Sequence, residues 1–184
     1  MMLSNSGFDL WADGYDQSVN LSEEADEYPF AGCKRVLNSI YNTIRAGHGN
    51  KILDVGLGTG VLAKRLYDDG YRVYGIDFSD KMIGIARKKM PDAVLIRYDF
   101  SQGLPNCLEN ESFDYIICTY AIHHLDNEQK VKLIHKLKTR LFSGGRLLIG
   151  DVAFRTEEDL RQCQVQSKEQ WDEEECYPVA NILE

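Results

Sequence analysis

Hydrophobic residues along the chain alternate between short apolar runs and longer stretches with helical spacing. In the stretch 29–46, Val36, Ile40 and Ile44 recur every three or four residues, which predicts an amphipathic helix. The compact apolar run Lys51–Val55 predicts a buried strand. The same alternation continues further along the chain. The predicted helices cover 29–46, 61–67, 80–90 and 127–141. The predicted strands cover 51–55, 72–77, 93–99, 113–119 and 146–151.

Local signals mark where these elements begin and end. Ser79 is the predicted N-cap of the helix 80–90, and Pro91 ends it. Asp126 followed by Gln129 predicts a capping box before the helix 127–141. The turn 143–145, Ser-Gly-Gly, leads into the last predicted strand.

Strands separated by helices predict an α/β fold with a doubly wound, mostly parallel sheet and helices on both faces. Ligands of such sheets bind beyond the carboxyl ends of the strands, near the point where the strand order reverses. We expect an N-terminal lid segment at 1–28, a cofactor-binding core at 29–155, and an acidic C-terminal segment, helical or loose, at 156–184.

Composition narrows the functional class. The chain has 184 residues, 43% of them hydrophobic, which suits one globular domain. Its net charge of −8 argues against a nucleic-acid partner. The apolar runs are too short to span a membrane, so we expect no membrane partner. The five cysteines form no C-x-x-C pair and predict a reducing, cytoplasmic location. The acidic runs 157–159 and 172–175 are interpreted as solvated helix surface or a loose tail.

A glycine-rich loop directly follows the first predicted strand. Asp54 precedes Gly56, Gly58 and Gly60, and the next helix starts at Val61. Glycine lets the backbone approach a ligand closely, and a helix N-terminus offers unpaired N–H groups. The loop therefore predicts a nucleotide-like cofactor, although glycine turns also serve as plain strand-to-helix connections.

Acidic and apolar residues at the ends of the next two strands extend this prediction. Asp77 is placed to accept hydrogen bonds from both hydroxyl groups of a ribose, or alternatively to cap the following helix. Asp99 is a candidate acceptor for an adenine amino group, or alternatively a turn-forming residue. Phe100 and Met82 are the candidate contacts of the adenine base, and Phe78 is a further candidate cofactor contact.

These motifs resemble the class I S-adenosylmethionine-dependent methyltransferases. The resemblance rests on the stretch Ile52 to Gly60, on Asp77 and Asp99, and on the segments Phe113 to Leu125 and Leu141 to Ile149. It implies a Rossmann-like methyltransferase fold and S-adenosyl-L-methionine as cofactor, with Asp54 and the three glycines among its contacts.

The sequence also resembles the small bacterial YrrT-like methyltransferases. The shared segments are Trp11 to Asp16, Thr119 to Leu125, and Gly150 to Phe154. In related enzymes the N-terminal segment closes over the cofactor, so Trp11 and Tyr15 are candidate lid residues, with Tyr15 a candidate cofactor contact. The alternative is that both simply pack on the domain.

Histidines after the fourth predicted strand are the candidate catalytic groups. If the methyl acceptor is protonated, His123 or His124 is placed to remove its proton, whereas the alternative role is packing or ordering of the loop. Tyr120 is a candidate cofactor contact. Adjacent histidines do not form a metal site without a further ligand, so we predict no metal.

The family fold continues beyond the fifth strand with a helix and a final strand pair. The last 33 residues are polar and acidic and do not predict a β-hairpin, so we expect the sequence to be cut at Glu184. The fifth strand would then be an exposed sheet edge that favours a homodimer.

The sequence thus predicts a methyltransferase acting on a small-molecule acceptor. One alternative is an S-adenosylmethionine-binding protein, or truncated remnant, without transferase activity. Another is an NAD-dependent oxidoreductase, whose G-x-G-x-x-G motif would require glycine at the position of Val61.

Overall fold

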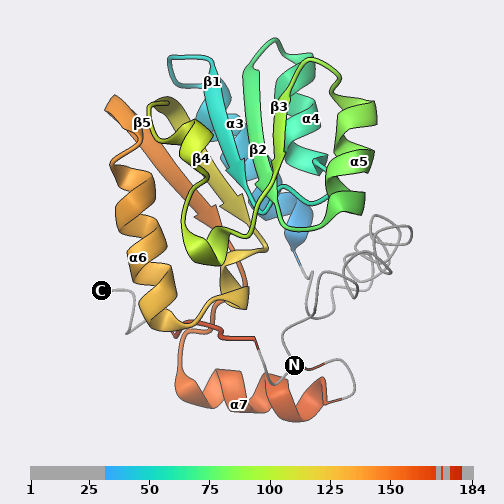
Figure 1. The fold of residues 1–184 in the computed structure, drawn as a ribbon. Helices are drawn as coiled ribbons and strands as arrows, with labels where there is room; N and C mark the ends of the chain where they lie inside the picture. Colours follow the sequence, from blue (N-terminus) through green and yellow to red (C-terminus); the bar gives the residue numbers. More distant parts are fainter. Residues whose placement is uncertain (1–31, 169–170, 172–174, 180–184) are drawn as a thin grey trace.

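The computed structural model describes residues 32–168, 171 and 175–179, which form a central sheet covered by helices (Figure 1). The strands are β1 Lys51–Val55, β2 Arg72–Asp77, β3 Val94–Arg97, β4 Phe113–Thr119 and β5 Leu141–Gly150. The α-helices are α3 Cys33–Arg45, α4 Val61–Asp68, α5 Asp80–Lys89, α6 Asn127–Lys138 and α7 Glu157–Gln166. The short 3₁₀ turns are η1 Phe100–Gln102, η2 Asn106–Leu108 and η3 Ile122–His124.

The strands of the described part pair in parallel in the order β3-β2-β1-β4-β5. From β1 the chain moves outward to β2 and β3, then returns to the other side of β1 with β4 and β5. The strand order therefore reverses between β1 and β4. This arrangement confirms the predicted doubly wound parallel sheet.

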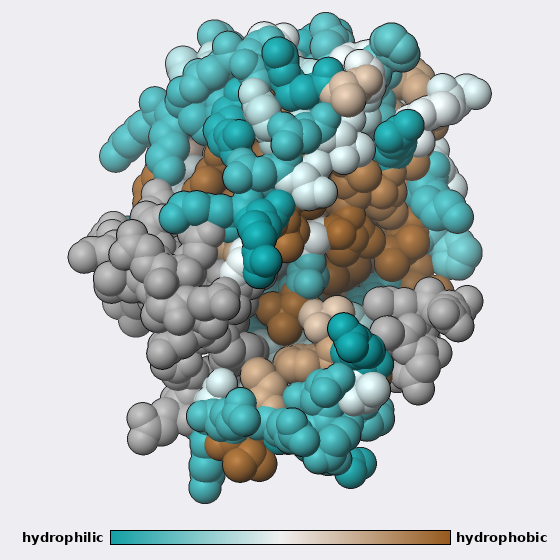
Figure 2. All heavy atoms as spheres, turned by 180° about the vertical axis from the view of Figure 1, so that it is seen from behind, coloured by the Kyte–Doolittle hydropathy of each residue, from teal (hydrophilic) through white to brown (hydrophobic). Residues whose placement is uncertain are grey.

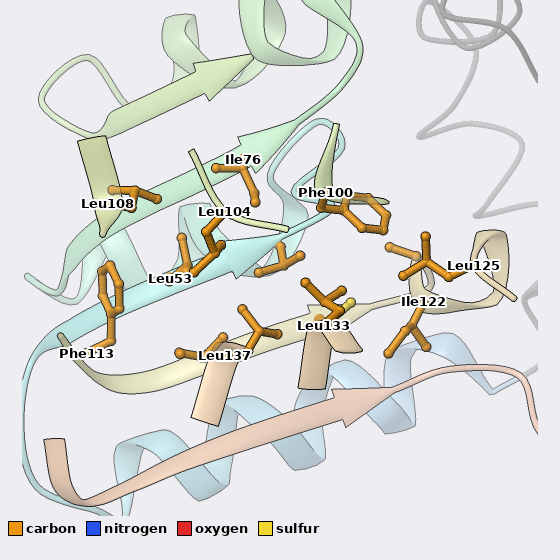
Figure 3. Packing of buried hydrophobic residues seen from close by; sticks show 14 residues of the cluster. Leu53, Ile76, Phe100, Leu104, Leu108, Phe113, Ile122, Leu125, Leu133 and Leu137 are labelled. Carbon is orange, nitrogen blue, oxygen red and sulfur yellow. The ribbon is translucent and has the colours of Figure 1, made fainter. Parts of the chain in front are cut away.

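Hydrophobic clusters lie on both faces of the sheet. On one face, side chains of β1, β2 and β4 pack against α6 and the η turns (Figure 3). The labelled members of this cluster are Leu53, Ile76, Phe100, Leu104, Leu108, Phe113, Ile122, Leu125, Leu133 and Leu137. On the other face, two further clusters join the sheet to α3, α4 and α5. Burial of both faces explains why the strands are almost continuously apolar.

Two of the predicted helix starts are confirmed in detail. The Ser79 side chain accepts a hydrogen bond from the backbone N–H of Met82 at 3.2 Å and caps α5. Asp126 and Gln129 form the predicted capping box of α6.

The boundary between α6 and β5 differs from the prediction. The helix was expected to reach Leu141 but ends at Lys138, because Leu141 already pairs with Phe113 of β4. Gly145, expected in a turn before the strand, lies inside β5 beside a register shift. A Cβ there would stand 3.0 Å from the backbone oxygen of Asp114, so only glycine fits without displacement.

No helix among the described residues is long and apolar enough to cross a membrane.

Candidate active site

A pocket opens at the carboxyl end of the sheet, between β1 and β4. The glycine loop and the start of α4 form one wall, the end of β4 forms another, and α3 contributes the third. Its lining residues are Cys33, Leu37, Asp54, Gly56, Leu57, Gly58, Thr59, Val61, Leu62, Thr119 and Tyr120. The pocket thus lies at the reversal of strand order, where ligands of doubly wound sheets bind.

The loop between β1 and α4 depends on its glycines. Gly56, Gly58 and Gly60 have φ values of 73°, 56° and 78°, in the left-handed region that favours glycine. A Cβ on Gly56 would also stand 2.3 Å from the Cβ of Ala121. The loop therefore folds tightly against the turn that follows β4, and its backbone forms the pocket wall.

Asp54 is a buried residue whose carboxyl group belongs to the lining of this pocket. It is 2% exposed, and its Oδ1 atom has no hydrogen-bond partner among the described residues. Burial, and secondarily the nearby charge of Asp77, raises the pKa of Asp54 to about 8. A buried carboxylate without a partner is costly, so the site is prepared for a ligand group that donates a hydrogen bond or carries positive charge.

Asp77, at the end of β2, connects the glycine loop to α5. Its Oδ2 atom accepts a hydrogen bond from the backbone N–H of Gly58 at 2.8 Å, and its Oδ1 atom accepts one from that of Ser79 at 2.9 Å. The cap of α5 itself is supplied by the Ser79 side chain. A carboxylate has about four lone-pair directions, so the Asp77 side chain can accept several hydrogen bonds at once.

Of the other predicted cofactor contacts that the structure describes, Tyr120 lines the pocket, whereas Phe78, Met82, Asp99 and Phe100 do not. Tyr120 lines the pocket and has a φ of 50°, unusual for a residue with a side chain. Phe100 and Met82 are buried in the core, and Phe78 is half-buried. Asp99 is exposed and accepts a hydrogen bond from the backbone N–H of Ser101 at 2.9 Å, the turn-forming role considered from the sequence.

The predicted lid residues Trp11 and Tyr15 lie outside the described residues.

The histidine turn η3 is held by Asp151, which follows β5. The Asp151 Oδ2 atom accepts hydrogen bonds from the backbone N–H groups of Ala121, Ile122 and His123 at 2.8–3.2 Å. The other carboxylate oxygen lies 2.5 Å from Nδ1 of the His123 ring. This geometry fixes the orientation of the His123 ring and of the turn that carries it.

His124 is the weaker candidate for a catalytic base. Burial, and secondarily the neighbouring His123, lowers the pKa of His124 to about 3. At neutral pH the His124 ring is therefore uncharged but a poor proton acceptor, which favours the loop-ordering role considered from the sequence.

Comparison with known proteins decides the family. The sequence family described as a methyltransferase domain matches residues 52–145, about half of the chain and most of the sheet. The chain belongs to this methyltransferase domain family. The methyltransferase identification made from the sequence is confirmed.

Relatives of this methyltransferase come from several bacteria. An uncharacterized methyltransferase of Geobacillus sp. (strain WCH70) is 38% identical over 163 residues, which are 88% of this chain and 73% of the relative. One of Geobacillus thermodenitrificans (strain NG80-2) is 40% identical over 156 residues, which are 84% of this chain and 69% of the relative. Their names state no acceptor, so the resemblance to the YrrT-like group stays a prediction.

Solved structures share the fold of this methyltransferase. The DhpI-SAM-HEP complex has a TM-score of 0.66 at 18% identity and covers 97% of this chain and 82% of that one. Magnesium protoporphyrin IX methyltransferase from Synechocystis PCC 6803 with bound SAH also has a TM-score of 0.66, at 22% identity, with 83% and 69% covered.

Sequence reasoning missed several residues of the methyltransferase's site. Cys33 and Leu37 reach the pocket from α3, where helical periodicity indicated only a core-facing side. Asp151 is the last residue of a predicted strand, as Asp77 and Asp99 are, and that shared position was its available signal. Glu175 gave no signal, because it lies in an acidic run interpreted as solvated surface. That interpretation is wrong for Glu175, whose side chain is only 16% exposed and lies beside both histidines.

Proposed function

We propose that this methyltransferase transfers the methyl group of S-adenosyl-L-methionine to a small-molecule acceptor. The observation that carries the proposal is the pocket at the reversal of strand order, with the glycine loop as its wall and an unpartnered buried carboxyl oxygen on Asp54. The DhpI-SAM-HEP complex and the magnesium protoporphyrin IX methyltransferase with bound SAH share this fold, which supports the choice of cofactor.

The residues present fit this cofactor. Asp77 would accept hydrogen bonds from the ribose hydroxyl groups of the cofactor. The loop glycines, which have no side chains, would let the cofactor approach the loop backbone closely. Asp54 would pair with its positively charged amino group, which removes the cost of the unpartnered oxygen. When bound, the cofactor supplies a methyl group already activated by a sulfonium.

The main role of the protein is therefore to align the acceptor with the methyl group of the cofactor. Holding the acceptor in line with the methyl group and excluding water supplies about 7–11 kcal/mol in favourable cases. We assign the pocket walls Thr119 and Tyr120, at the end of β4, to this positioning.

The net charge of the chain bears on which class of acceptor it can bind. A net charge of −8 disfavours nucleic acid and supports a small molecule as the partner. All five cysteines are free thiols, which supports the cytoplasmic location expected from the sequence.

Val61 argues against a dinucleotide cofactor. It lines the pocket at the position where the dinucleotide motif requires glycine, and it is 47% exposed. Its branched side chain occupies space that the close approach of a pyrophosphate needs.

Ligand-dependent melting tests the proposal. S-adenosylhomocysteine should raise the melting temperature of the purified chain, whereas NAD at the same concentration should not. Methyl transfer from labelled S-adenosylmethionine to a panel of small acceptors then tests catalysis. Stabilisation by NAD alone would overturn the proposed cofactor. Binding of S-adenosylhomocysteine without transfer to any acceptor would instead indicate a cofactor-binding protein.

A further inference from the structure

The histidine turn η3 meets a carboxylate from the C-terminal segment 175–179. Oε1 of Glu175 lies 3.6 Å from Nε2 of His123 and 3.7 Å from Nδ1 of His124. One potential ligand atom from each of the three side chains lies within 4.8 Å of the other two. Two ring nitrogens and one carboxylate oxygen therefore converge on one point, although 51 residues separate His124 from Glu175 along the chain.

Two of these side chains, His123 and Glu175, are oriented by further partners. Nδ1 of the His123 ring faces Asp151 at 2.5 Å, which directs Nε2 toward Glu175. The second carboxylate oxygen of Glu175 accepts a hydrogen bond from the Tyr177 hydroxyl group. Metal-binding histidines and carboxylates in proteins are typically held by outer hydrogen bonds of this kind.

Backbone contacts place the C-terminal segment against η3. The N–H of Cys176 donates to the backbone oxygen of His123 at 2.8 Å, and the Lys130 ammonium donates to the backbone oxygen of Cys176. On the other side, the N–H of Phe154 donates to the backbone oxygen of Pro178 at 3.0 Å. Glu175 is thus set beside the histidines by the fold.

We propose that His123, His124 and Glu175 form a site for a divalent transition metal, with Zn²⁺ as the ion that it fits best. Nitrogen and carboxylate ligands bind Zn²⁺ at about 2.0–2.2 Å, which puts tetrahedral ligand atoms about 3.4 Å apart. The observed 3.6 and 3.7 Å are close to that spacing. The sequence predicted no metal because adjacent histidines lacked a further ligand, and Glu175 is that ligand.

The inferred site has three protein ligands, so a fourth position is left for water or for a lone pair of another molecule. Zinc sites with three protein ligands and one open position are the reactive kind, whereas purely structural zinc is bound by four protein ligands. The site is separate from the pocket of the proposed cofactor, because no residue that lines that pocket supplies a ligand.

A competing explanation uses the same residues without an ion. The contacts of the His123 ring with Asp151 at 2.5 Å and with Glu175 at 3.6 Å would by themselves hold the C-terminal segment in place. The two explanations differ in their response to added metal, because an ion pair needs none.

Metal titration of the whole chain tests the proposal. The protein is stripped with chelator, dialysed and titrated with Zn²⁺ by calorimetry, and Co²⁺ is used as a coloured probe of ligand geometry. We expect one ion per chain and a Zn²⁺-dependent rise in melting temperature. His124→Ala and Glu175→Gln should each weaken binding at least tenfold. Tyr177→Phe, which removes only an outer hydrogen bond, should weaken it about tenfold or more.

A matched control is His135→Ala, which removes an exposed histidine of α6. It should bind Zn²⁺ as the wild type does. Absence of stoichiometric binding at micromolar Zn²⁺ to the folded wild-type chain would overturn the site. Equal affinity of the wild type and folded Glu175→Gln would overturn it as well, and would leave the ion pair as the role of these residues.

Discussion

At the scale of single residues, Asp54 has the most perturbed environment in the pocket. Its pKa of about 8 in the folded chain lies above the unfolded value near 3.8. The folded state therefore holds this proton more tightly than the unfolded state does. The contribution of Asp54 to the free energy of unfolding is therefore fully present below pH 3.8 and is lost as the pH rises toward 8.

Replacement by a neutral side chain of the same shape should remove this pH dependence. We expect Asp54→Asn to raise the free energy of unfolding at pH 8.5 relative to the wild type, by at least about 1.4 kcal/mol, the equivalent of one pKa unit. At pH 4 the two proteins should differ much less. Denaturant unfolding at both pH values measures this. Glu157→Gln, at an exposed position of α7, serves as control and should show no such gain.

The same carboxyl group should make cofactor binding depend on pH. A positively charged ligand group favours the ionised form of Asp54, so below pH 8 its proton must leave when the ligand binds. We expect the affinity for S-adenosylhomocysteine to rise between pH 6 and pH 7.5, by up to about tenfold per pH unit. Calorimetry should detect release of a proton, and an affinity independent of pH in this range would contradict the assigned pairing.

Asp77 should matter for binding more than a neighbouring acid does. Asp77→Ala removes an acceptor for the ribose and also the anchor of the Gly58 N–H, so we expect a loss of about 1.5–3 kcal/mol in cofactor binding. Asp80→Ala is the matched control, because Asp80 is exposed and forms an ion pair with Arg97 at 3.2 Å. Equal affinity of both variants for S-adenosylhomocysteine would remove Asp77 from the site.

Sequence reasoning identified the residues whose roles depend on local geometry. Asp54, Gly56 and Asp77 lie at or just after the carboxyl ends of strands, and parallel strands bring such positions to one edge of the sheet. Glu175 could not be identified in this way, because its partners lie on η3 and only the folded chain brings them together. For Asp99 the sequence allowed two roles, and the structure contains the local one, a bond to the backbone of Ser101.

At the scale of elements, the loop between β1 and α4 is the most constrained connection. Gly56 and Gly70 both have positive φ values, 73° and 87°. A Cβ on Gly56 would meet Ala121 at 2.3 Å, whereas one on Gly70 would meet nothing within 4 Å. Substitutions at Gly56 and Gly70 therefore distinguish the loss of stability caused by backbone strain from the loss caused by a steric clash.

We expect Gly56→Ala to be clearly more destabilising than Gly70→Ala. Left-handed backbone costs a residue with a Cβ about 1–2 kcal/mol, and this part is common to both variants. The clash with Ala121 adds to it only at position 56. Urea unfolding of both variants measures the difference in the free energy of unfolding. Equal losses would show that the turn after β4 can move aside without destabilising the protein.

The predicted elements failed mainly where pairing between distant segments overrides a local pattern. The apolar spacing of α6 continues to Leu141, so periodicity alone extends the helix. Because Leu141 pairs with Phe113 in the sheet, α6 ends at Lys138, three residues before Leu141. Hydrogen bonds across the sheet are not visible in a local pattern, which explains why element types were predicted better than their boundaries.

At the scale of the whole molecule, β5 is an edge strand of the described sheet. Phe142 and Ile149 on this strand are 48% and 40% exposed. Seen from behind in Figure 2, hydrophobic side chains gather on one part of the surface, and the molecule is hollowed between the sheet and the region of α7. Unpaired backbone groups next to apolar side chains favour pairing with a second chain.

We therefore expect this chain to form a homodimer through β5. Light scattering coupled to gel filtration should give twice the chain mass at micromolar concentration. Ile149→Lys should shift the mass toward the monomer, whereas Val165→Lys, at a 77% exposed position of α7, should not. A wild-type chain that stays monomeric at all accessible concentrations would contradict this interface.

Tyr120 joins the two sites of the molecule. It lines the cofactor pocket, its left-handed backbone allows little freedom, and the turn that begins after it carries His123 and His124. A metal ion on the histidines and a cofactor in the pocket would therefore share one strained hinge. By thermodynamic reciprocity, the factor by which Zn²⁺ changes cofactor affinity must equal the factor by which the cofactor changes Zn²⁺ affinity. A Zn²⁺ ion that displaced Tyr120 would make the occupancy of the cofactor site depend on metal supply.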